Sequence, residues 1–300
     1  MKKIIISSGT GFLGQVLVDH FRNKYEEIII LTRGAERKEG NVKYLNWDGR
    51  TLGNWANEFT DVTHLINLTG KSVDCRYNEK NRKEILDSRI YSTNILAEAI
   101  KKSGHKPEVW INAASATIYD WSFTTPQTEA NGIIGDDFSM NICKAWEKVF
   151  FSHTGAANKM IAMRISMVFG EQGGVLPILK RITKAGLGGT QGSGKQMVSW
   201  IDAKDYARMT EWLLNKPGAD AIYNCCAPNP LPNKEMMKLI RNYCNRSFGL
   251  PQAEWMIKFG SLLLGTEAEL VLKSRYVVPE KALQQGFTFE KNYLSEALGI

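Results

Sequence analysis

A glycine-rich stretch near the amino terminus carries the clearest chemical signal in the sequence. Residues 7–14 read Ser-Ser-Gly-Thr-Gly-Phe-Leu-Gly and lie between a short apolar run and an amphipathic stretch. A glycine turn between a strand and a helix lets the backbone approach a pyrophosphate, whose charge then lies at the positive end of the helix. A tight turn without a ligand is the alternative, but this context favours a dinucleotide. The predicted cofactor contacts are Gly9, Thr10, Gly11, Phe12, Leu13 and Gly14.

The residues after the second apolar run indicate which dinucleotide is bound. An acidic side chain at this place hydrogen-bonds the ribose hydroxyls of NAD and repels the extra phosphate of NADP. Here the run ends in Thr32-Arg33-Gly34, and the first acidic residue is Glu36. A guanidinium suits a 2′-phosphate because it presents paired donors and a permanent charge. We therefore predict NADP rather than NAD, with Thr32 and Arg33 at the site; an ordinary surface arginine is the alternative.

The elements that must position these residues alternate between strands and helices. Apolar segments predict buried strands at residues 3–7, 28–31, 64–68, 109–114, 159–169 and 221–227. Amphipathic spacing predicts helices at about 13–21, 85–100 and 136–152. This alternation indicates βαβ units, and so a Rossmann-type α/β fold with a doubly wound parallel sheet.

A change of composition after Gly170 marks a second part of the chain. Glycine is frequent as far as Gly194, as in loops around a binding cleft, and the chain from Asn233 onward is mostly helical. We expect a Rossmann domain of residues 1–170 plus about 199–228. A smaller, mostly helical C-terminal cap of about 171–198 plus 229–300 is expected on the substrate side.

The excess of basic residues suits an anionic small-molecule substrate. The formal net charge is +7, and the lysines and arginines are scattered along the chain. The densest run, Lys80, Arg82 and Lys83, has one aromatic neighbour, Tyr77, so a solvated surface explains it better than a nucleic-acid site. We expect no nucleic-acid partner, while a homodimer stays open.

Cysteine, histidine and hydrophobic patterns argue against several other classes of protein. The five cysteines lack CxxC spacing and the four histidines form no HxxxH pair, so we expect neither a disulfide framework nor a metal site. The apolar run after Met-Lys-Lys is too short for a signal peptide, and no run reaches the ~18 residues of a membrane span. We therefore expect a cytoplasmic protein that does not enter the membrane.

Several motifs are similar to those of the extended short-chain dehydrogenase/reductases, which include nucleotide-sugar epimerases and dehydratases. The glycine turn resembles their TGxxGxxG, with Ser8 where the first glycine stands. Asn67-Leu68-Thr69-Gly70 resembles their NNAG-type segment, which implies cofactor contacts from Leu68, Thr69 and Gly70. Residues 115–119, Ser-Ala-Thr-Ile-Tyr, resemble the SSATVYG segment, whose serine at the place of Ser115 helps polarise the substrate oxygen.

A closer resemblance is to the atypical epimerase-family proteins within that group. The shared features are Leu-Thr-Arg at 31–33, Asp-Ser-Arg at 87–89, Cys-x-x-Trp-Glu at 143–147, Ser-Trp-Ile at 199–201, Arg-Tyr-Val-Val-Pro at 275–279 and Gly-Phe-Thr-Phe at 286–289. No single feature is specific, but their order and spacing along almost the whole chain are. The chain is identified on this basis as a member of the subgroup.

One departure from the family pattern concerns the expected catalytic pair. The larger family carries Tyr-x-x-x-Lys, in which the phenol is the general acid or base and the lysine lowers its pKa and binds the cofactor ribose. Counting back from Glu147, Ser139 and Cys143 stand at these two places, and no tyrosine of the chain has a lysine four residues later. Either another group moves the proton, or the usual redox chemistry is absent.

The remaining candidates each have a structural alternative. We list as catalytic candidates Ser115 (otherwise a turn serine), Tyr119 (otherwise a packing aromatic) and Lys144 (otherwise solvated). Lys71, Arg76 and Arg89 follow the third predicted strand and could grip an anionic substrate, or could be surface charges. Trp200 is kept as a substrate contact, although packing beneath the cap explains it more simply.

Two functions of different class follow from these observations. The first is an NADP-dependent oxidoreductase or epimerase acting on a nucleotide-linked or phosphorylated sugar, with the cofactor supplying the difficult chemistry. The second is a catalytically silent NADPH-binding protein that reports redox state to a partner. The absent Tyr-Lys pair favours the second, whereas the retained Ser115 segment favours the first.

Overall fold

The computed structural model describes residues 2–219 and 221–300, and one large sheet lies at its centre. Its strands are β1 (Lys3–Ser7), β2 (Glu27–Thr32), β3 (Arg37–Glu39), β4 (Val42–Asn46), β5 (His64–Asn67), β6 (Val109–Ser115), β7 (Lys159–Ile165) and β12 (Ile222–Cys225). They lie in the order β12-β7-β6-β5-β1-β2-β4-β3, and β3 with β4 is the antiparallel pair. The predicted fold class is confirmed. Met1 and Asp220, which fall in the predicted Rossmann domain, lie outside the described residues.

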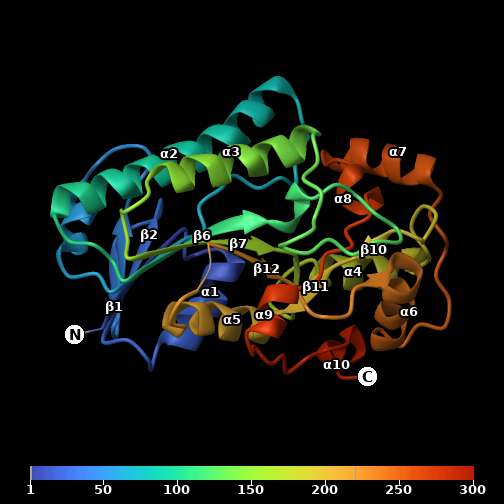
Figure 1. The fold of residues 1–300 in the computed structure, drawn as a ribbon. Helices are drawn as coiled ribbons and strands as arrows, with labels where there is room; N and C mark the ends of the chain where they lie inside the picture. Colours follow the sequence, from blue (N-terminus) through green and yellow to red (C-terminus); the bar gives the residue numbers. More distant parts are fainter. Residues whose placement is uncertain (1, 220) are drawn as a thin grey trace.

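Helices cover both faces of this sheet (Figure 1). On one face lie α2 (Glu79–Ser103) and α3 (Phe138–Ser152); on the other lie α1 (Phe12–Phe21), α5 (Ala203–Asn215) and α9 (Glu280–Gln284). Alternate strand residues serve two cores, since Ile4 and Ile6 pack with α1 and α5, whereas Ile5 packs with α2 and α3. Strands buried on both faces are nearly continuous apolar runs, which is why the sequence pattern reveals them.

Two parts of the strand pattern differ from expectation. The sequence pattern gives no sign of β4, because Lys43 interrupts its apolar residues and Asn46 ends the strand with an exposed polar side chain. The segment predicted as one strand at 159–169 divides at Ser166. Its second part, β8 (Met167–Gly170), pairs with β11 (Trp200–Asp202) and β9 (Gly173–Gly174) in a separate small sheet.

Short elements make up the cap and the remaining connections. They are η1 (Asn54–Thr60), η2 (Ala116–Ile118), α4 (Leu176–Ile182), the π-helical turn η3 (Thr183–Leu187), β10 (Met197–Val198), β13 (Leu231–Pro232), α6 (Asn233–Tyr243), α7 (Glu254–Leu264), α8 (Glu269–Leu272) and α10 (Leu294–Leu298). The tail does not stay within the cap, because Ala282, Phe287 and Phe289 pack in the core beneath the large sheet. The predicted cap of 229–300 is too wide by this segment.

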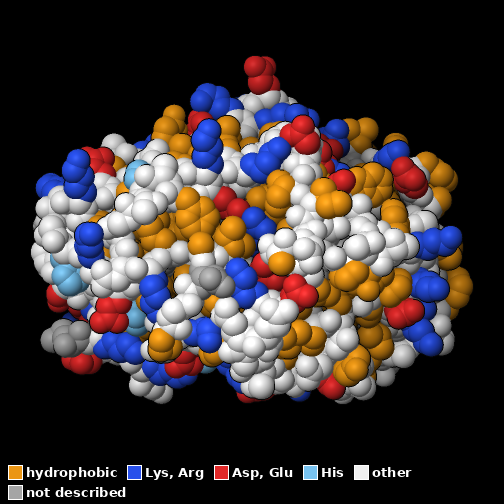
Figure 2. All heavy atoms as spheres, viewed as in Figure 1, with side chains coloured by type: hydrophobic (Ala, Val, Ile, Leu, Met, Phe, Trp, Pro, Cys, Tyr) orange, Lys and Arg blue, Asp and Glu red, His pale blue; other side chains and the backbone are white. Residues whose placement is uncertain are grey.

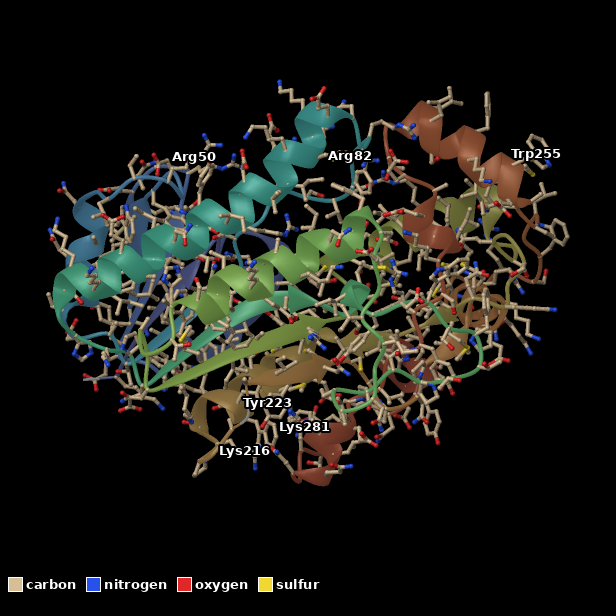
Figure 3. All side chains as sticks on the ribbon, turned by 45° about the horizontal axis from the view of Figure 1, so that its top comes forward. Arg50, Arg82, Lys216, Tyr223, Trp255 and Lys281 are labelled. Carbon is tan, nitrogen blue, oxygen red and sulfur yellow. The ribbon has the colours of Figure 1, made fainter. Side chains whose placement is uncertain are left out.

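Helix α7 leaves large apolar side chains on the surface of the cap. Trp255 is 70% exposed and Leu263 is 72% exposed. Figure 2 shows hydrophobic side chains at the edge of the molecule where α7 lies, and Figure 3 places Trp255 there. Within residues 2–219 and 221–300, no helix combines the length and the apolar character needed to cross a bilayer.

Candidate functional site

The glycine turn joins β1 to α1 with a backbone that only small residues allow. A Cβ on Gly14 would lie 2.4 Å from the Cα of Gly9, so the first turn of α1 rests directly on the end of the strand connection. A Cβ on Gly11 would meet only the Ser8 oxygen, at 3.6 Å, which leaves space in front of the helix. No side chain caps α1 at Gly11, and its first turn holds no acidic residue. These free N–H groups and the helix dipole suit a pyrophosphate.

Residues at the ends of β2 and β4 form the next part of the site. The hydroxyls of Thr10 and Thr32 lie 3.3 Å apart, and Thr32 Oγ1 accepts a hydrogen bond from Gly34 N at 3.2 Å. The exposed Arg33 follows the strand. Its backbone oxygen accepts a hydrogen bond from Asn46 Nδ2 at 3.3 Å. Asn46 was missed because β4 was missed, although it stands level with Thr32 in the sheet.

A buried polar network ties together the ends of the three central strands β1, β5 and β6. Ser7 Oγ donates to Asn67 Oδ1 at 2.6 Å, and Asn67 Nδ2 donates to Asn112 Oδ1 at 2.7 Å. Thr69 Oγ1 donates to Ser7 Oγ at 2.8 Å. Leu68, Thr69 and Gly70 are thereby placed at the carboxyl edge beside the glycine turn, where a doubly wound fold binds its ligand.

The glycines after β8 do not simply form open loops, as the sequence pattern led us to expect. Cβ atoms on Gly170, Gly173 and Gly174 would each lie 2.5 to 2.9 Å from an atom of Phe12 or of the backbone. The predicted cofactor residue Phe12 therefore packs its ring into this glycine surface. These glycines hold the glycine turn against the small sheet of β8, β9 and β11.

Ser115 ends β6, and the side chain of Cys143 on α3 lies near it. Its Oγ accepts a bond from Thr117 N at 3.2 Å. Burial raises the pKa of the Cys143 thiol to about 12, which makes it a poor nucleophile. Lys144 is not part of this cluster, because its ammonium pairs with Asp136 at 2.7 Å near the start of α3. The predicted ribose contact by Lys144 thus has no support in the structure.

Tyr119 lies in the interior, where it serves packing and hydrogen bonding. Its hydroxyl donates to Asn224 Oδ1 at 2.9 Å and accepts from Arg164 Nη1 at 2.7 Å. Arg164 is also paired with the buried Glu147 at 2.8 Å. Burial raises the pKa of the Tyr119 phenol, and Arg164 opposes that shift only in part. We therefore withdraw Tyr119 as a proton donor, since its side chain is 1% exposed and its hydroxyl is fully engaged.

The structure places the predicted substrate residues in different environments. Lys71 pairs with Glu84, and Arg76 donates to Thr266 O at 3.0 Å and pairs with Glu267 at 3.4 Å. The Trp200 side chain is fully buried in the cap core, and its Nε1 donates to Asn229 O at 3.0 Å. Trp200 is a packing residue, and the substrate contact predicted for it is incorrect. Arg89 lies against Gly70 at the carboxyl edge of β5.

Tyr77 is a site residue that the sequence analysis mentions only as a neighbour of basic residues. Its phenol lies near Ser139, the residue at the place of the family's catalytic tyrosine, and the Ser139 hydroxyl donates to Glu269. Its ring packs edge-on against Phe138, with centroids 4.9 Å apart. Burial raises the pKa of the Tyr77 phenol to about 12. Sequence spacing gave no sign of this, because Tyr77 and Ser139 lie on different elements, the loop after β5 and the start of α3.

Two hollows in the surface lie away from these residues. One is lined by residues between Ala97 and Lys106 and between His153 and Ala156, and the other by residues 183–186 and 245–248. Neither lining includes a predicted site residue. In the part of the chain that the structure describes, no cluster of three or more His, Cys, Asp or Glu side chains is arranged to hold a metal ion. The candidate site therefore rests on the strand ends and on the chemistry of their side chains.

The strand-end geometry agrees with a family comparison. The model of the NAD dependent epimerase/dehydratase family matches residues 4–226. The chain belongs to this family. Residues 254–299 match a second model, described as Domain of unknown function (DUF1731).

Relatives extend this assignment over the whole chain. The epimerase family protein YfhF of Bacillus subtilis is 32% identical over 299 residues, which cover 98% of this chain and 96% of the relative. The epimerase family protein SH2119 of Staphylococcus haemolyticus is 30% identical, with 99% and 98% covered. The predicted membership of the epimerase-family proteins is confirmed.

Two solved structures share the fold. The human epimerase family protein SDR39U1, solved with NADPH, superposes with a TM-score of 0.85 at 24% identity, covering 99% of this chain and 97% of that one. UDP-N-acetylglucosamine 4-epimerase from Bacillus cereus superposes with a TM-score of 0.76 at 20% identity, covering 99% and 94%. At these identities the likeness establishes the architecture.

Proposed function

We propose that this protein binds NADP(H) at the carboxyl edge of β1, β2 and β5. The observation that carries the proposal is the uncapped start of α1, where Gly14 rests on Gly9 and the space before Gly11 is open. Gly9, Gly11 and the strand-end residues 68–70 would hold the pyrophosphate and nicotinamide side, and Arg33 would hold the 2′-phosphate. The NADPH in the human family member supports this choice of cofactor.

The proposed reaction is an oxidoreduction or epimerisation of a nucleotide-linked or phosphorylated sugar. When bound, the nicotinamide supplies or accepts the hydride. Ser115 at the end of β6 donates a hydrogen bond to the substrate oxygen, which stabilises charge that develops there. The epimerases among the family's solved structures support a sugar substrate.

Tyr77 is the residue that we propose as the general acid. Its phenol lies near Ser139, so a tyrosine from the loop after β5 would take the role that the family's tyrosine has on the helix. With its pKa raised to about 12, the phenol is protonated near neutral pH and can donate the proton from Oη to a substrate oxygen as that carbon is reduced. Tyr119 cannot take this role because it is buried.

A catalytically silent NADPH-binding protein is the second candidate. It is favoured by Ser139 and Cys143 at the places of the catalytic tyrosine and lysine, together with the engagement of Lys144 by Asp136. Such a protein binds the cofactor but turns nothing over. The two candidates therefore differ in turnover and agree in cofactor binding.

The deciding experiment pairs cofactor titration with a search for turnover. NADPH and NADH affinities are measured by fluorescence, and cofactor oxidation or reduction is followed with a panel of nucleotide-linked and phosphorylated sugars. If a substrate is found, Tyr77→Phe should lower turnover about 10²–10⁴-fold, the usual contribution of a general acid. Tyr119→Phe is the matched control and should leave turnover unchanged. Tight NADPH binding without turnover on any sugar would establish the silent protein instead.

A further inference from the structure

The basic side chains around Tyr77 differ in how their charge is balanced. Those that are at least half-buried are Lys71, Arg76, Arg89, Lys273 and Arg275, while the exposed Arg82 donates to Tyr77 O. Three of them form ion pairs: Lys71 with Glu84, Arg76 with Glu267, and Lys273 with Asp137 and Glu269. Arg89 and Arg275 form no ion pair with a carboxylate of residues 2–219 or 221–300. We refer to these two residues as the arginine pair.

Arg89 is held in place by neutral groups. Its Nη1 donates to Lys71 O at 3.2 Å and to Ile85 O at 2.8 Å, and its Cζ lies 4.9 Å from the Trp146 ring centre. Nη2 and Nε have no protein acceptor in the described part of the chain. The guanidinium is thus oriented on one side by carbonyls and on one face by an aromatic ring, while further donors remain available.

Arg275 also has a guanidinium donor without an acceptor, and this donor is buried. Its Nη1 is inaccessible to solvent, yet it has no hydrogen-bond partner among the described residues. Its backbone is fixed, because its N donates to Met197 O at 2.7 Å and its O accepts from Ser199 Oγ at 2.8 Å. A buried donor without an acceptor is costly, more so when it carries charge. The nearby carboxylates of Asp137 and Glu269 are already engaged by Lys273.

The arginine pair lies near the position of the missing catalytic residues. Both guanidiniums lie within electrostatic reach of the Cys143 thiol and of the Tyr77 phenol. Burial lowers the pKa of both arginines, and for Arg275 the carboxylates of Asp137 and Glu269 oppose that shift only in part. Ser139 and Cys143 stand where the family has its tyrosine and lysine, so this positive charge lies close to the reacting part of a substrate.

We propose that Arg89 and Arg275 together bind an oxyanion of the substrate, a carboxylate or a phosphate, next to the reacting carbon. Guanidinium groups match both anions because they donate two parallel hydrogen bonds. The bound anion would compensate the charges of Arg89 and Arg275, neither of which forms an ion pair with a carboxylate of residues 2–219 or 221–300. The inference rests on the proposed function for the placement of the reacting carbon, and it narrows the substrate to one that is anionic at its reacting end.

The test is a titration with small anions, because the substrate itself is unidentified. Oxalate, inorganic phosphate and UDP-glucose are titrated by calorimetry into the protein, alone and saturated with NADP⁺. Oxalate or phosphate should bind, and Arg275→Gln should weaken that binding about 10- to 100-fold, the range for a hydrogen bond between charged groups. Arg275→Lys, which keeps the charge but loses the paired donors, should give a smaller loss.

Arg82→Gln is the matched control. Arg82 carries an equal charge on the same side of the molecule, with its Cζ 4.4 Å from the Phe138 ring centre and its Nε donating to Tyr77 O, but it is exposed (Figure 3). This variant should bind the anions as the parent does. Equal losses in Arg82→Gln and Arg275→Gln, or unchanged binding in Arg275→Gln, would overturn the proposal.

The remaining outcomes also have definite meanings. Oxalate binding without phosphate binding assigns a carboxylate substrate, and the reverse assigns a phosphorylated one. Binding of UDP-glucose alone, or of none of the three probes, overturns the arginine pair as an anion site. If the parent protein binds the anions but does not bind NADP⁺, the proposed function is refuted, while the arginine pair is still supported as an anion site. Unchanged NADPH affinity and thermal unfolding in Arg275→Gln show that the variant is folded.

Discussion

The two sides of the candidate site are built in different ways. On the cofactor side, residues 7–14 act through their backbone, with Gly14 resting on Gly9 and no side chain capping α1. On the substrate side, charged and polar side chains come together from segments far apart in the chain, at Tyr77, Ser139 and Arg275. The first site is therefore a local motif, whereas the second is a product of tertiary packing. Substitutions should therefore act through shape on one side and through charge or proton transfer on the other.

The largest effects are expected in the glycine turn. Gly11→Val should abolish NADPH binding in a folded protein, because a branched side chain fills the space before α1 while its Cβ meets only Ser8 O at 3.6 Å. Gly14→Val should also destabilise the fold, by at least the roughly 1–3 kcal/mol typical of overpacking, because its Cβ overlaps the Gly9 backbone. Fluorescence titration and thermal unfolding measure the two effects separately. Parent-like NADPH affinity in Gly11→Val would place the cofactor elsewhere.

Next in size is the loss of the Ser115 hydroxyl, which tests the substrate side. Ser115→Ala should lower turnover about 10²-fold, by analogy with the loss of one oxyanion donor. NADPH affinity should not change, because Ser115 Oγ bonds Thr117 N at the end of β6 and is not part of the glycine turn. Ser115→Thr retains the hydroxyl and should recover part of the rate. If Ser115→Ala turns over as the parent does, Ser115 is a structural serine at the end of β6.

Arg33→Ala is expected to have a moderate effect that is confined to the cofactor side. It should weaken NADPH binding by about 1.5–3 kcal/mol, the range for hydrogen bonds to charged groups, and leave NADH binding nearly unchanged. Arg37→Ala is the control, since Arg37 is an exposed arginine nearby that pairs with Glu39 at 2.7 Å. Equal losses for the two cofactors would remove Arg33 from the 2′-phosphate site.

The smallest effect on activity is expected at Tyr119. Tyr119→Phe removes a buried hydroxyl from Arg164 and Asn224 and should lower the free energy of unfolding by about 1–3 kcal/mol. Turnover at saturating cofactor should stay at the parent value. A large fall in turnover with normal stability would restore Tyr119 as the proton donor and would count against Tyr77.

Most of the fold could be predicted from the sequence because its strands are buried on both faces. Runs such as residues 3–7 are continuously apolar, and a turn of glycines after the first strand identifies the binding edge. β4 escaped prediction because Lys43 and Asn46 give it a mixed pattern. The tail at Phe287 was assigned to the cap because its packing beneath the large sheet depends on contacts distant in sequence.

The site residues also divide into those that local sequence predicts and those that depend on contacts distant in sequence. The glycine turn and the segment after Asn67 were found because their spacing alone implies their chemistry. Tyr77 and Arg275 were not found, because a phenol near Ser139 and a guanidinium near Cys143 become visible only when α2, α3 and the tail are placed together. Trp200 shows the opposite error, since a conspicuous aromatic residue between predicted elements proved to be fully buried.

The amide pair of Asn67 and Asn112 affects the register between strands β5 and β6. The two residues stand opposite each other in β5 and β6, and both side chains are fully buried. A shift of β6 by one residue against β5 would turn Asn112 to the other face of the sheet, away from Asn67, and would leave the hydrogen bond between them unmade. Apolar residues alone tolerate such a slip more easily than this pair does. The amide pair therefore fixes the register of β5 against β6. In this way it sets the positions of Thr69 and Ser115 relative to each other before any ligand binds.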